Sequence, residues 1–468
     1  MEQLSGGDAI FLAMETPIAP GHVGGLSVLD VSEAEGFGYD RICQVTDERM
    51  RLEPRYTRKL REVPFGLDRP YLVADPAFDV RNHIHRVAVP APGGRRELAD
   101  LTGYLFSRPL GRDRPLWEMW LVEGVAEGRM ALIMKSHHCL MDGVASAGLG
   151  ELLCDLEPHP ESAPSRMRPS AEPEPELSDL AVAARAVGNA VARPLKLARL
   201  GARILRQGAS MVASSLLDPE APPLPSAVPL VSFNRMLGPR RAFAYASVPL
   251  AAVKAVKREF DVTVNDVILA ITGSAVRRYL LERCELPEKP LVALIAVSRR
   301  DAGDLSVGNA VTTVPVGWAT DLDDPVARLR CIHRNAAKSK EFARNYDVDF
   351  LAGVGESLSP LATNLGMRSF GGVASSLGTL ANVVVSNVRA TPVPLYVGGA
   401  KIESMYPLSI LGPSQGLNAT LVSYMGNVDV GFTVDPQLVP DPWVLADAIP
   451  QALDELSSAS SRSARSAA

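Results

Sequence analysis

Apolar and polar stretches alternate through most of the chain in a pattern typical of mixed α/β proteins. One apolar run, Met130–Met134, leads into the adjacent residues His137 and His138, and Asp142 and Gly143 follow closely. Beyond them, apolar residues recur at helical spacing, namely Ala145, Leu149, Leu152, Leu153 and Leu156. The pattern predicts a strand, a loop and a helix, with two imidazoles, a carboxylate and a glycine on the loop.

A second strand-like run lies just before the first. It covers Trp117–Glu123 and is separated from Met130–Ser136 by the segment GVAEGR, which is typical of a hairpin turn. The hairpin would deliver His137 and His138 to the edge of a sheet.

The C-terminal half repeats the alternation of strands and helices. A strand is predicted at Arg241–Val248, and a helix is predicted from the segment that begins at Thr263. Thr263 and Asp266 have the spacing of a capping box, which places Asn265 in the first helical turn. Further strand-like runs, the last two forming a hairpin, are Leu291–Val297, Val311–Val316, Ala381–Ser386, Asn418–Tyr424 and Val428–Val434.

Shifts in composition divide the 468 residues into four segments. Residues 1–160 form an N-terminal domain, and residues 161–230 form a Pro-rich connector with a basic amphipathic helix. Residues 231–456 form a C-terminal domain, and the tail 457–468 is poor in apolar residues and is expected to be disordered.

The connector carries basic residues and no acidic ones between Asp179 and Asp218. Its predicted basic face consists of Lys196, Arg199, Arg203 and Arg206. Its predicted apolar face consists of Leu197, Leu200, Ile204 and Met211. Such a helix fits two interpretations: it lies on an anionic membrane or lipid-droplet surface, or it packs across the two domains with a solvated basic edge.

The amino-acid composition limits the classes of protein to which this chain can belong. A hydrophobic fraction of 47% with 22% charged residues is that of a globular protein with a sizeable core, and a net charge of −5 provides no basic field for nucleic acid. The 5 cysteines are scattered without CxxC spacing, which favours a reducing cytoplasm. No signal peptide and no long apolar span are predicted, so any membrane association is expected to be peripheral.

The histidine pair is the strongest chemical signal. A neutral imidazole at a strand end is suited to take a proton from a hydroxyl group, which makes the pair a candidate general base. A metal site is the other specific reading, but adjacent histidines at a strand exit point to opposite sides and no Cys or His cluster lies nearby, so we expect no metal. The segment Gly412–Gly416 matches the G-x-S-x-G hydrolase motif, yet a strand follows it and no later histidine exists.

The pattern HHxxxDG at His137–Gly143 resembles the signature of the CoA-dependent acyltransferase superfamily. Further segments, in the same order, are similar to the bacterial wax ester synthase/diacylglycerol acyltransferase family, which includes the mycobacterial-type triacylglycerol synthases. These segments are Leu4–Pro17, His22–Leu26, Arg69–Ile84, Pro115–Gly124, Asn265–Ala270 and Val385–Arg389. The resemblance implies two chloramphenicol-acetyltransferase-like domains, each a mixed sheet with flanking helices, and an active-site tunnel at their interface.

The resemblance also implies roles for the signature residues. His138, the second histidine, would act as general base without an acyl-enzyme, and His137 would support the loop. Asp142 would hold the loop through an ion pair, with Arg299 or Arg300 as its partner.

Two further residues are candidate substrate contacts. Gly143 lacks a Cβ and would let acyl-CoA approach the backbone. Asn265 is a candidate donor to the oxyanion, and the alternative for Asn265 is that it only belongs to the helix cap.

The implied reaction moves a long-chain acyl group from acyl-CoA, a co-substrate rather than a bound cofactor, to diacylglycerol or a long-chain alcohol. The implied location is cytoplasmic and peripheral, at the inner membrane face or lipid droplets. Tyr71 and Leu72 stand where the family commonly has a Trp, and ATPVP follows Val385–Arg389 in place of Gly-Pro, so the acceptor alcohol stays open. Two alternatives are a carrier-protein-dependent condensation-type acyltransferase and a non-catalytic lipid-droplet protein.

Overall fold

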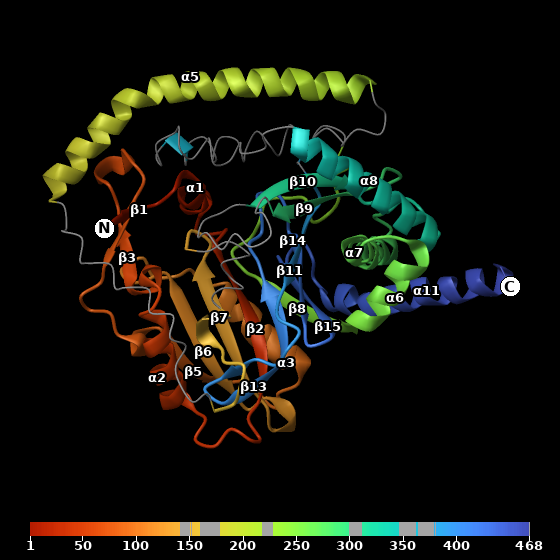
Figure 1. Ribbon diagram of the computed structural model, residues 1–468, viewed down its shortest axis with the longest axis horizontal. Helices are drawn as coiled ribbons and strands as arrows, with labels where there is room; N and C mark the ends of the chain where they lie inside the picture. Colours follow the sequence, from red (N-terminus) through yellow and green to blue (C-terminus); the bar gives the residue numbers. More distant parts are fainter. Residues whose placement is uncertain are drawn as a thin grey trace.

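Among the residues that the structure describes, two six-stranded sheets and a small three-stranded sheet form the framework (Figure 1). The computed structural model describes residues 1–140, 150, 152–159, 178–217, 228–298, 311–345, 362–363, 379 and 381–467. The predicted site residues Asp142 and Gly143, and the expected partners Arg299 and Arg300, lie outside the described residues.

The first large sheet carries the histidine pair. In spatial order its strands are β12 (Tyr396–Val397), β13 (Ala400–Leu408), β2 (His22–Asp30), β7 (Met130–His137), β6 (Trp117–Glu123) and β5 (Ile84–Ala88). β6 and β7 form the predicted antiparallel hairpin, whose connection contains the short 3-10 helix η4 (Ala126–Gly128).

The hairpin brings the histidine pair to the end of the sheet, where β7 stops at His137. β7 is an interior strand, because β2 pairs with its other side from His22↔His137 to Leu29↔Met130. A Cβ on Gly24 would collide with the backbone carbonyl of Met134, so glycine allows this close approach.

The second large sheet belongs to the C-terminal half. Its strands are, in order, β10 (Val311–Gly317), β9 (Val292–Ser298), β11 (Val383–Arg389), β14 (Leu417–Tyr424), β15 (Asn427–Val434) and β8 (Ala242–Pro249). β11 pairs in parallel with β9 and β14, while the other pairs are antiparallel, including the predicted β14–β15 hairpin. The small sheet contains β1 (Glu2–Gln3), β4 (Tyr71–Ala74) and β3 (Arg58–Arg61).

Helices flank the sheets on several sides (Figure 1). Their bounds are α1 (Gly6–Met14), α2 (Tyr39–Met50), α3 (Arg95–Phe106), α5 (Asp179–Leu217), α6 (Leu250–Phe260), α7 (Val264–Glu282), α8 (Pro325–Asn345) and α11 (Trp443–Ala467). Further 3-10 helices are η1 (Pro54–Thr57), η2 (Pro64–Gly66) and η3 (Val80–Asn82). α6, α7, α8 and α11 pack on one another beside the C-terminal sheet, and α5 arches along one side of the molecule. In the described parts of the chain, no helix has the length and apolar content that a membrane span needs.

Two observations concern the predicted segments. β12 and β13 come from the predicted C-terminal domain, yet β13 pairs with β2 of the N-terminal sheet, from Lys401↔Asp30 to Leu408↔Gly24. Pairing between strands so far apart in the sequence depends on tertiary packing, which the composition of each segment does not reveal. At the C-terminus, α11 continues to Ala467, across the tail expected to be disordered.

The hydrophobic core also joins the two halves. Phe106 and Ile133 from the N-terminal half belong to the same buried cluster as Phe243 and Trp443 from the C-terminal half. α3 packs directly against β8. Both halves therefore contribute to the packing around β7.

Candidate active site

The histidine pair lies where β7 ends. The backbone N–H of His137 donates to the carbonyl of Leu116 at 2.9 Å, and that of His138 donates to the carbonyl of Gly21 at 2.9 Å. These two bonds come from the segments that precede β6 and β2. They fix the backbone at the point where the chain leaves the sheet.

The side chain of His137 is enclosed, with 1% of its surface exposed. Its Nδ1 accepts the backbone N–H of Cys139 at 3.1 Å, so the neutral ring carries its proton on Nε2. Nε2 lies 3.6 Å from Oε1 of Glu15. The Cys139 N–H holds one side of this ring, the Glu15 carboxylate faces the other, and protein atoms enclose the ring.

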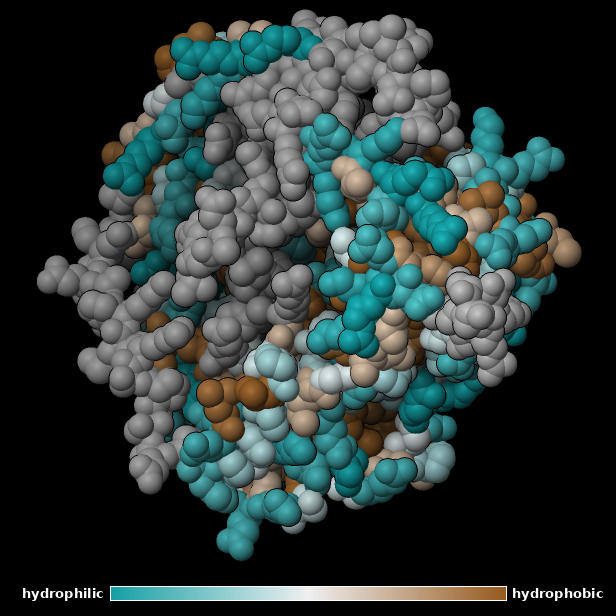
Figure 2. Space-filling model, turned by 45° about the vertical axis from the view of Figure 1, so that its right-hand side comes forward, coloured by the Kyte–Doolittle hydropathy of each residue, from teal (hydrophilic) through white to brown (hydrophobic). Residues whose placement is uncertain are grey.

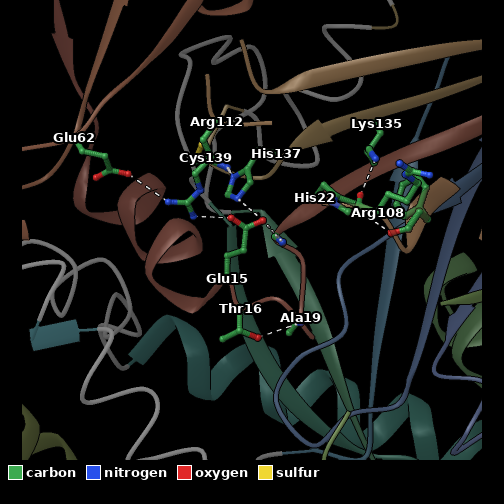
Figure 3. A network of polar contacts seen from close by, with 12 residues as sticks. Glu15, Thr16, Ala19, His22, Glu62, Arg108, Arg112, Lys135, His137 and Cys139 are labelled. Carbon is green, nitrogen blue, oxygen red and sulfur yellow. Dashed lines mark hydrogen bonds and ion pairs between the residues drawn. The ribbon is translucent and has the colours of Figure 1, made fainter. Parts of the chain in front are cut away.

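Glu15 connects the first histidine to a chain of charges (Figure 3). Its Oε1 accepts the backbone N–H of Gly21 at 3.1 Å, and its Oε2 accepts Nη2 of Arg112 at 2.6 Å. Arg112 also contacts Glu62 at 3.3 Å. Burial alone would raise the pKa of Glu15, but its interactions with His137, Arg112 and Gly21 lower it to about 2. Glu15 is therefore a carboxylate at neutral pH.

Gly21 leaves space for the imidazole of His137 beside the carboxylate of Glu15. A Cβ at position 21 would lie 2.6 Å from Nε2 of His137 and 3.3 Å from the carbonyl oxygen of Phe11. Any larger residue would push the imidazole away from Glu15. Glu15 and Gly21 were missed as site residues by the sequence reasoning, although Glu15 lies within one of the segments that carry the family resemblance.

His138 differs from its neighbour because its side chain is partly exposed. Its ring stacks on Phe11 of α1, with centroids 3.8 Å apart and an interplanar angle of 15°. The stacking sets the plane of the imidazole. Of the two histidines, His138 is therefore the more exposed one.

Cys139 follows the pair and is fully buried. Burial raises the pKa of its thiol well above the ordinary range, so it stays protonated at neutral pH. This supports the interpretation that it fills space rather than acting as a nucleophile. Among the described residues, no group of three or more His, Cys, Asp or Glu side chains is arranged to hold a metal ion.

Asn265 lies in the first turn of α7, as predicted, and its side chain is partly exposed. The capping box is formed by its neighbours: Asp266 N–H donates to Oγ1 of Thr263 at 3.2 Å, and Thr263 N–H donates to Oδ2 of Asp266 at 2.8 Å. The capping role therefore belongs to Thr263 and Asp266, and the role of Asn265 as an oxyanion donor stays a prediction.

The cap of α7 has a further partner that the sequence reasoning did not identify. Nδ1 of His333, on α8, lies 2.7 Å from Oδ2 of the buried Asp266. The contact ties the first turn of α7 to a neighbouring helix. Nothing in the local pattern around His333 marks it, because the two residues are 67 positions apart.

The tunnel expected between the domains stays a prediction. One cavity of about 380 Å³ lies where α3 meets α11 and is lined by Arg95, Arg96, Glu97, Trp443 and Asp447. Another, of about 610 Å³, opens beside the start of α2, with Phe37 and Tyr39 in its lining. Neither of these two cavities includes His137 or His138.

Comparison with known proteins gives consistent matches along the chain. Residues 4–268 match the wax ester synthase/diacylglycerol acyltransferase catalytic domain, and residues 307–457 match the C-terminal domain of the same family. A putative diacylglycerol O-acyltransferase of Mycobacterium tuberculosis is 37% identical over 468 residues, which cover 97% of this chain and 90% of the relative. A probable diacylglycerol O-acyltransferase of the same organism is 32% identical, with 94% and 95% covered.

Solved structures agree with these matches. The wax ester synthase/diacylglycerol acyltransferase from Marinobacter aquaeolei VT8 superposes with a TM-score of 0.71 at 27% identity, covering 98% of this chain and 100% of that one. The first condensation domain of the calcium-dependent antibiotic synthetase superposes with a TM-score of 0.58 at 14% identity, covering 97% and 96%. The latter likeness concerns the fold alone.

Proposed function

The chain belongs to the wax ester synthase/diacylglycerol acyltransferase family, and we propose that it transfers a long-chain acyl group from acyl-CoA to diacylglycerol, with fatty alcohols as a second class of acceptor. The product is triacylglycerol in the first case and a wax ester in the second. The match of both parts of the chain to this family carries the proposal. No bound cofactor takes part in the scheme.

The chemical problem is that an alcohol is a poor nucleophile while it keeps its proton. In the proposed step His138 removes the hydroxyl proton as the oxygen attacks the thioester carbon. The C–O bond forms, the C–S bond breaks, and His138 returns the proton to the departing CoA thiolate. No acyl-enzyme forms. The partial exposure of His138 and its stacking on Phe11 support this role.

The other signature residues have supporting roles in the proposal. His137 holds the loop geometry, a role supported by its burial and by its contacts with Cys139 and Glu15. Asp142 stabilises the loop, Gly143 lets acyl-CoA pass close to the backbone, and Asn265 donates to the tetrahedral oxyanion. These last three roles rest on the family resemblance.

We also propose a cytoplasmic, peripheral location at the inner membrane face or on lipid droplets. Diacylglycerol and long-chain alcohols reside in membranes, and the product separates into droplets. The exposed basic residues of α5, among them Lys196, Arg199 and Arg206, support attraction to an anionic surface.

The two alternatives predict different results. A condensation-type enzyme would need a carrier-protein thioester, and a non-catalytic lipid-droplet protein would transfer nothing. The test is incubation of the purified protein with labelled palmitoyl-CoA and either diolein or hexadecanol. Labelled triacylglycerol or wax ester supports the proposal, the ratio of the two identifies the preferred acceptor, and absence of both products contradicts it.

A further inference from the structure

Helix α5 is attached to the body of the protein through one face of its first half. This docked face consists of Val182, Ala186, Asn189 and Arg193. Val182 and Ala186 are buried in a cluster with Val63, Tyr71 and Val73. Asn189 and Arg193 contact the carboxylate of Asp68 at 2.6 and 2.8 Å.

The opposite face of the same helix is apolar and points away from the body. Its large side chains are strongly exposed: Leu180 (81%), Val187 (57%), Val191 (77%) and Leu195 (58%). The spacing of seven, four and four residues places them in one stripe along a helix, because each residue advances by about 100°. We call these four residues the outer stripe. Figure 2 shows hydrophobic residues along the outer edge of α5, at the upper left.

The outer stripe is not the apolar face expected from the sequence. Leu197, a member of the expected face, follows Val182 and Ala186 by 15 and 11 residues, which puts it on the docked side of the helix. The side chains of Leu200, Arg203, Ile204 and Met211 lie outside the described residues. The helix thus has an anchored side and, opposite to it, a separate apolar side that faces solvent.

An exposed apolar stripe of this length marks a contact surface. The charges around the outer stripe indicate which kind of partner binds there. The helix carries no acidic residue after Asp179, and Arg185, Lys196, Arg199 and Arg206 are exposed. Apolar side chains bordered by basic ones match the interface of an anionic phospholipid layer, where acyl chains and headgroup charges lie close together.

A neighbouring loop adds a second exposed apolar element. Val63 and Asp68, which contact the docked face of α5, bracket the turn at η2. Phe65 at the tip of this turn is 86% exposed, and Leu67 is 39% exposed. The loop that holds α5 therefore also presents apolar side chains to solvent, as lipid-binding loops do.

We propose that the outer stripe docks α5 on an anionic phospholipid surface, with the docked face keeping the helix attached to the protein. The biological purpose of this docking, delivery of a lipid acceptor, rests on the proposed acyl transfer, whereas the docking itself does not. Residues Glu62 and Arg112 connect the loop region to Glu15 and the histidine pair. The lipid contact therefore lies in the same half of the molecule as the proposed base.

The test is cosedimentation with vesicles of phosphatidylcholine, with and without phosphatidylglycerol. The outer-stripe variant carries Leu180→Gln, Val187→Gln, Val191→Gln and Leu195→Gln. The matched control carries the same change at four exposed apolar residues outside α5, namely Leu230, Met236, Leu281 and Val393. We expect the wild type and the control to bind phosphatidylglycerol vesicles equally and the outer-stripe variant to bind about tenfold or more weakly.

Equal binding by the outer-stripe variant and the wild type would overturn the proposal, as would a wild type that does not bind phosphatidylglycerol vesicles. If the four substitutions together lower the melting temperature, the double variant Val191→Gln, Leu195→Gln provides an independent check. We expect its loss of vesicle binding to be intermediate. Transfer to detergent-solubilised diolein is measured in parallel. Vesicle binding without acyl transfer would contradict the proposed function but not the docking proposal. Acyl transfer without vesicle binding would contradict the docking proposal but not the proposed function.

Discussion

Oε1 of Glu15 faces Nε2 of His137 at 3.6 Å, although the two residues are far apart in the sequence. The carboxylate comes from the end of α1 and the imidazole from the end of β7. Nδ1 of the same ring accepts the Cys139 N–H, so a hydrogen bond holds one nitrogen of His137 and a carboxylate faces the other. The contact keeps the first histidine in the interior, while the second, which stacks on Phe11, is partly exposed.

Replacing Glu15 tests whether this contact positions the catalytic loop. Glu15→Ala should lower kcat by up to about 100-fold, because a small displacement of the neighbouring His138 suffices for such a loss. Glu15→Gln, which keeps an oxygen and the side-chain length, should retain more activity. The KM for acyl-CoA should change little in both variants. Equal kcat for wild type and Glu15→Ala would show that the contact has no positioning role.

Gly21→Ala probes the same contact by steric means. The added Cβ would lie 2.6 Å from Nε2 of His137, so we expect a loss of activity and a destabilisation of about 1–3 kcal/mol. Gly25→Ala is the matched control, because a Cβ there has its nearest neighbour, the carbonyl oxygen of Tyr406, at 3.6 Å. Kinetics and chemical denaturation of both variants provide the comparison. Similar behaviour of the two would argue against a tight fit around His137.

Asp429 should make stability depend on pH. Burial raises the pKa of this carboxyl group to about 6, despite hydrogen bonds from Ser247 and from Met405 N–H. Between 3.8, the ordinary pKa of an aspartate, and about 6 the folded state holds more protons than the unfolded state, so stability falls as pH rises through this window and then levels off.

Asp429→Asn should remove that slope and gain up to about 3 kcal/mol at pH 7 relative to the wild type. Urea denaturation at several pH values from 4 to 7 measures the effect, and the exposed Asp447→Asn serves as control. A wild type whose stability rises steadily across this window would contradict the assignment.

His333 should act on the start of α7. His333→Ala removes the contact with Asp266 and should cost about 1 kcal/mol of stability, since the histidine is partly exposed. If Asn265 stabilises the oxyanion, kcat should fall as well, with little change in KM. His333→Gln, which keeps a hydrogen-bond donor, should retain part of the stability and part of the kcat that His333→Ala loses. A loss of stability with unchanged kcat would show that the contact of His333 with the cap of α7 does not affect catalysis.

Local signals predicted the elements whose stabilising contacts are local. The Thr263/Asp266 capping box and the two hairpins were correctly placed because three-residue capping and short turns are encoded nearby in the chain. The pairing of β13 with β2 and the contact of Glu15 with His137 join distant segments, and no periodicity encodes them. For α5, helical spacing defined the helix, but the side that packs on the protein depends on Asp68 and Val63, far from it in sequence.

The central claim, that His138 is the general base, is tested most directly by His138→Ala in the palmitoyl-CoA and diolein assay. The partly exposed side chain leaves no large core cavity, so circular dichroism and melting temperature should match the wild type. The rate of triacylglycerol formation should fall by about 100- to 10,000-fold, the usual contribution of a general acid/base group. A variant that retains more than about a tenth of wild-type activity would contradict the assignment.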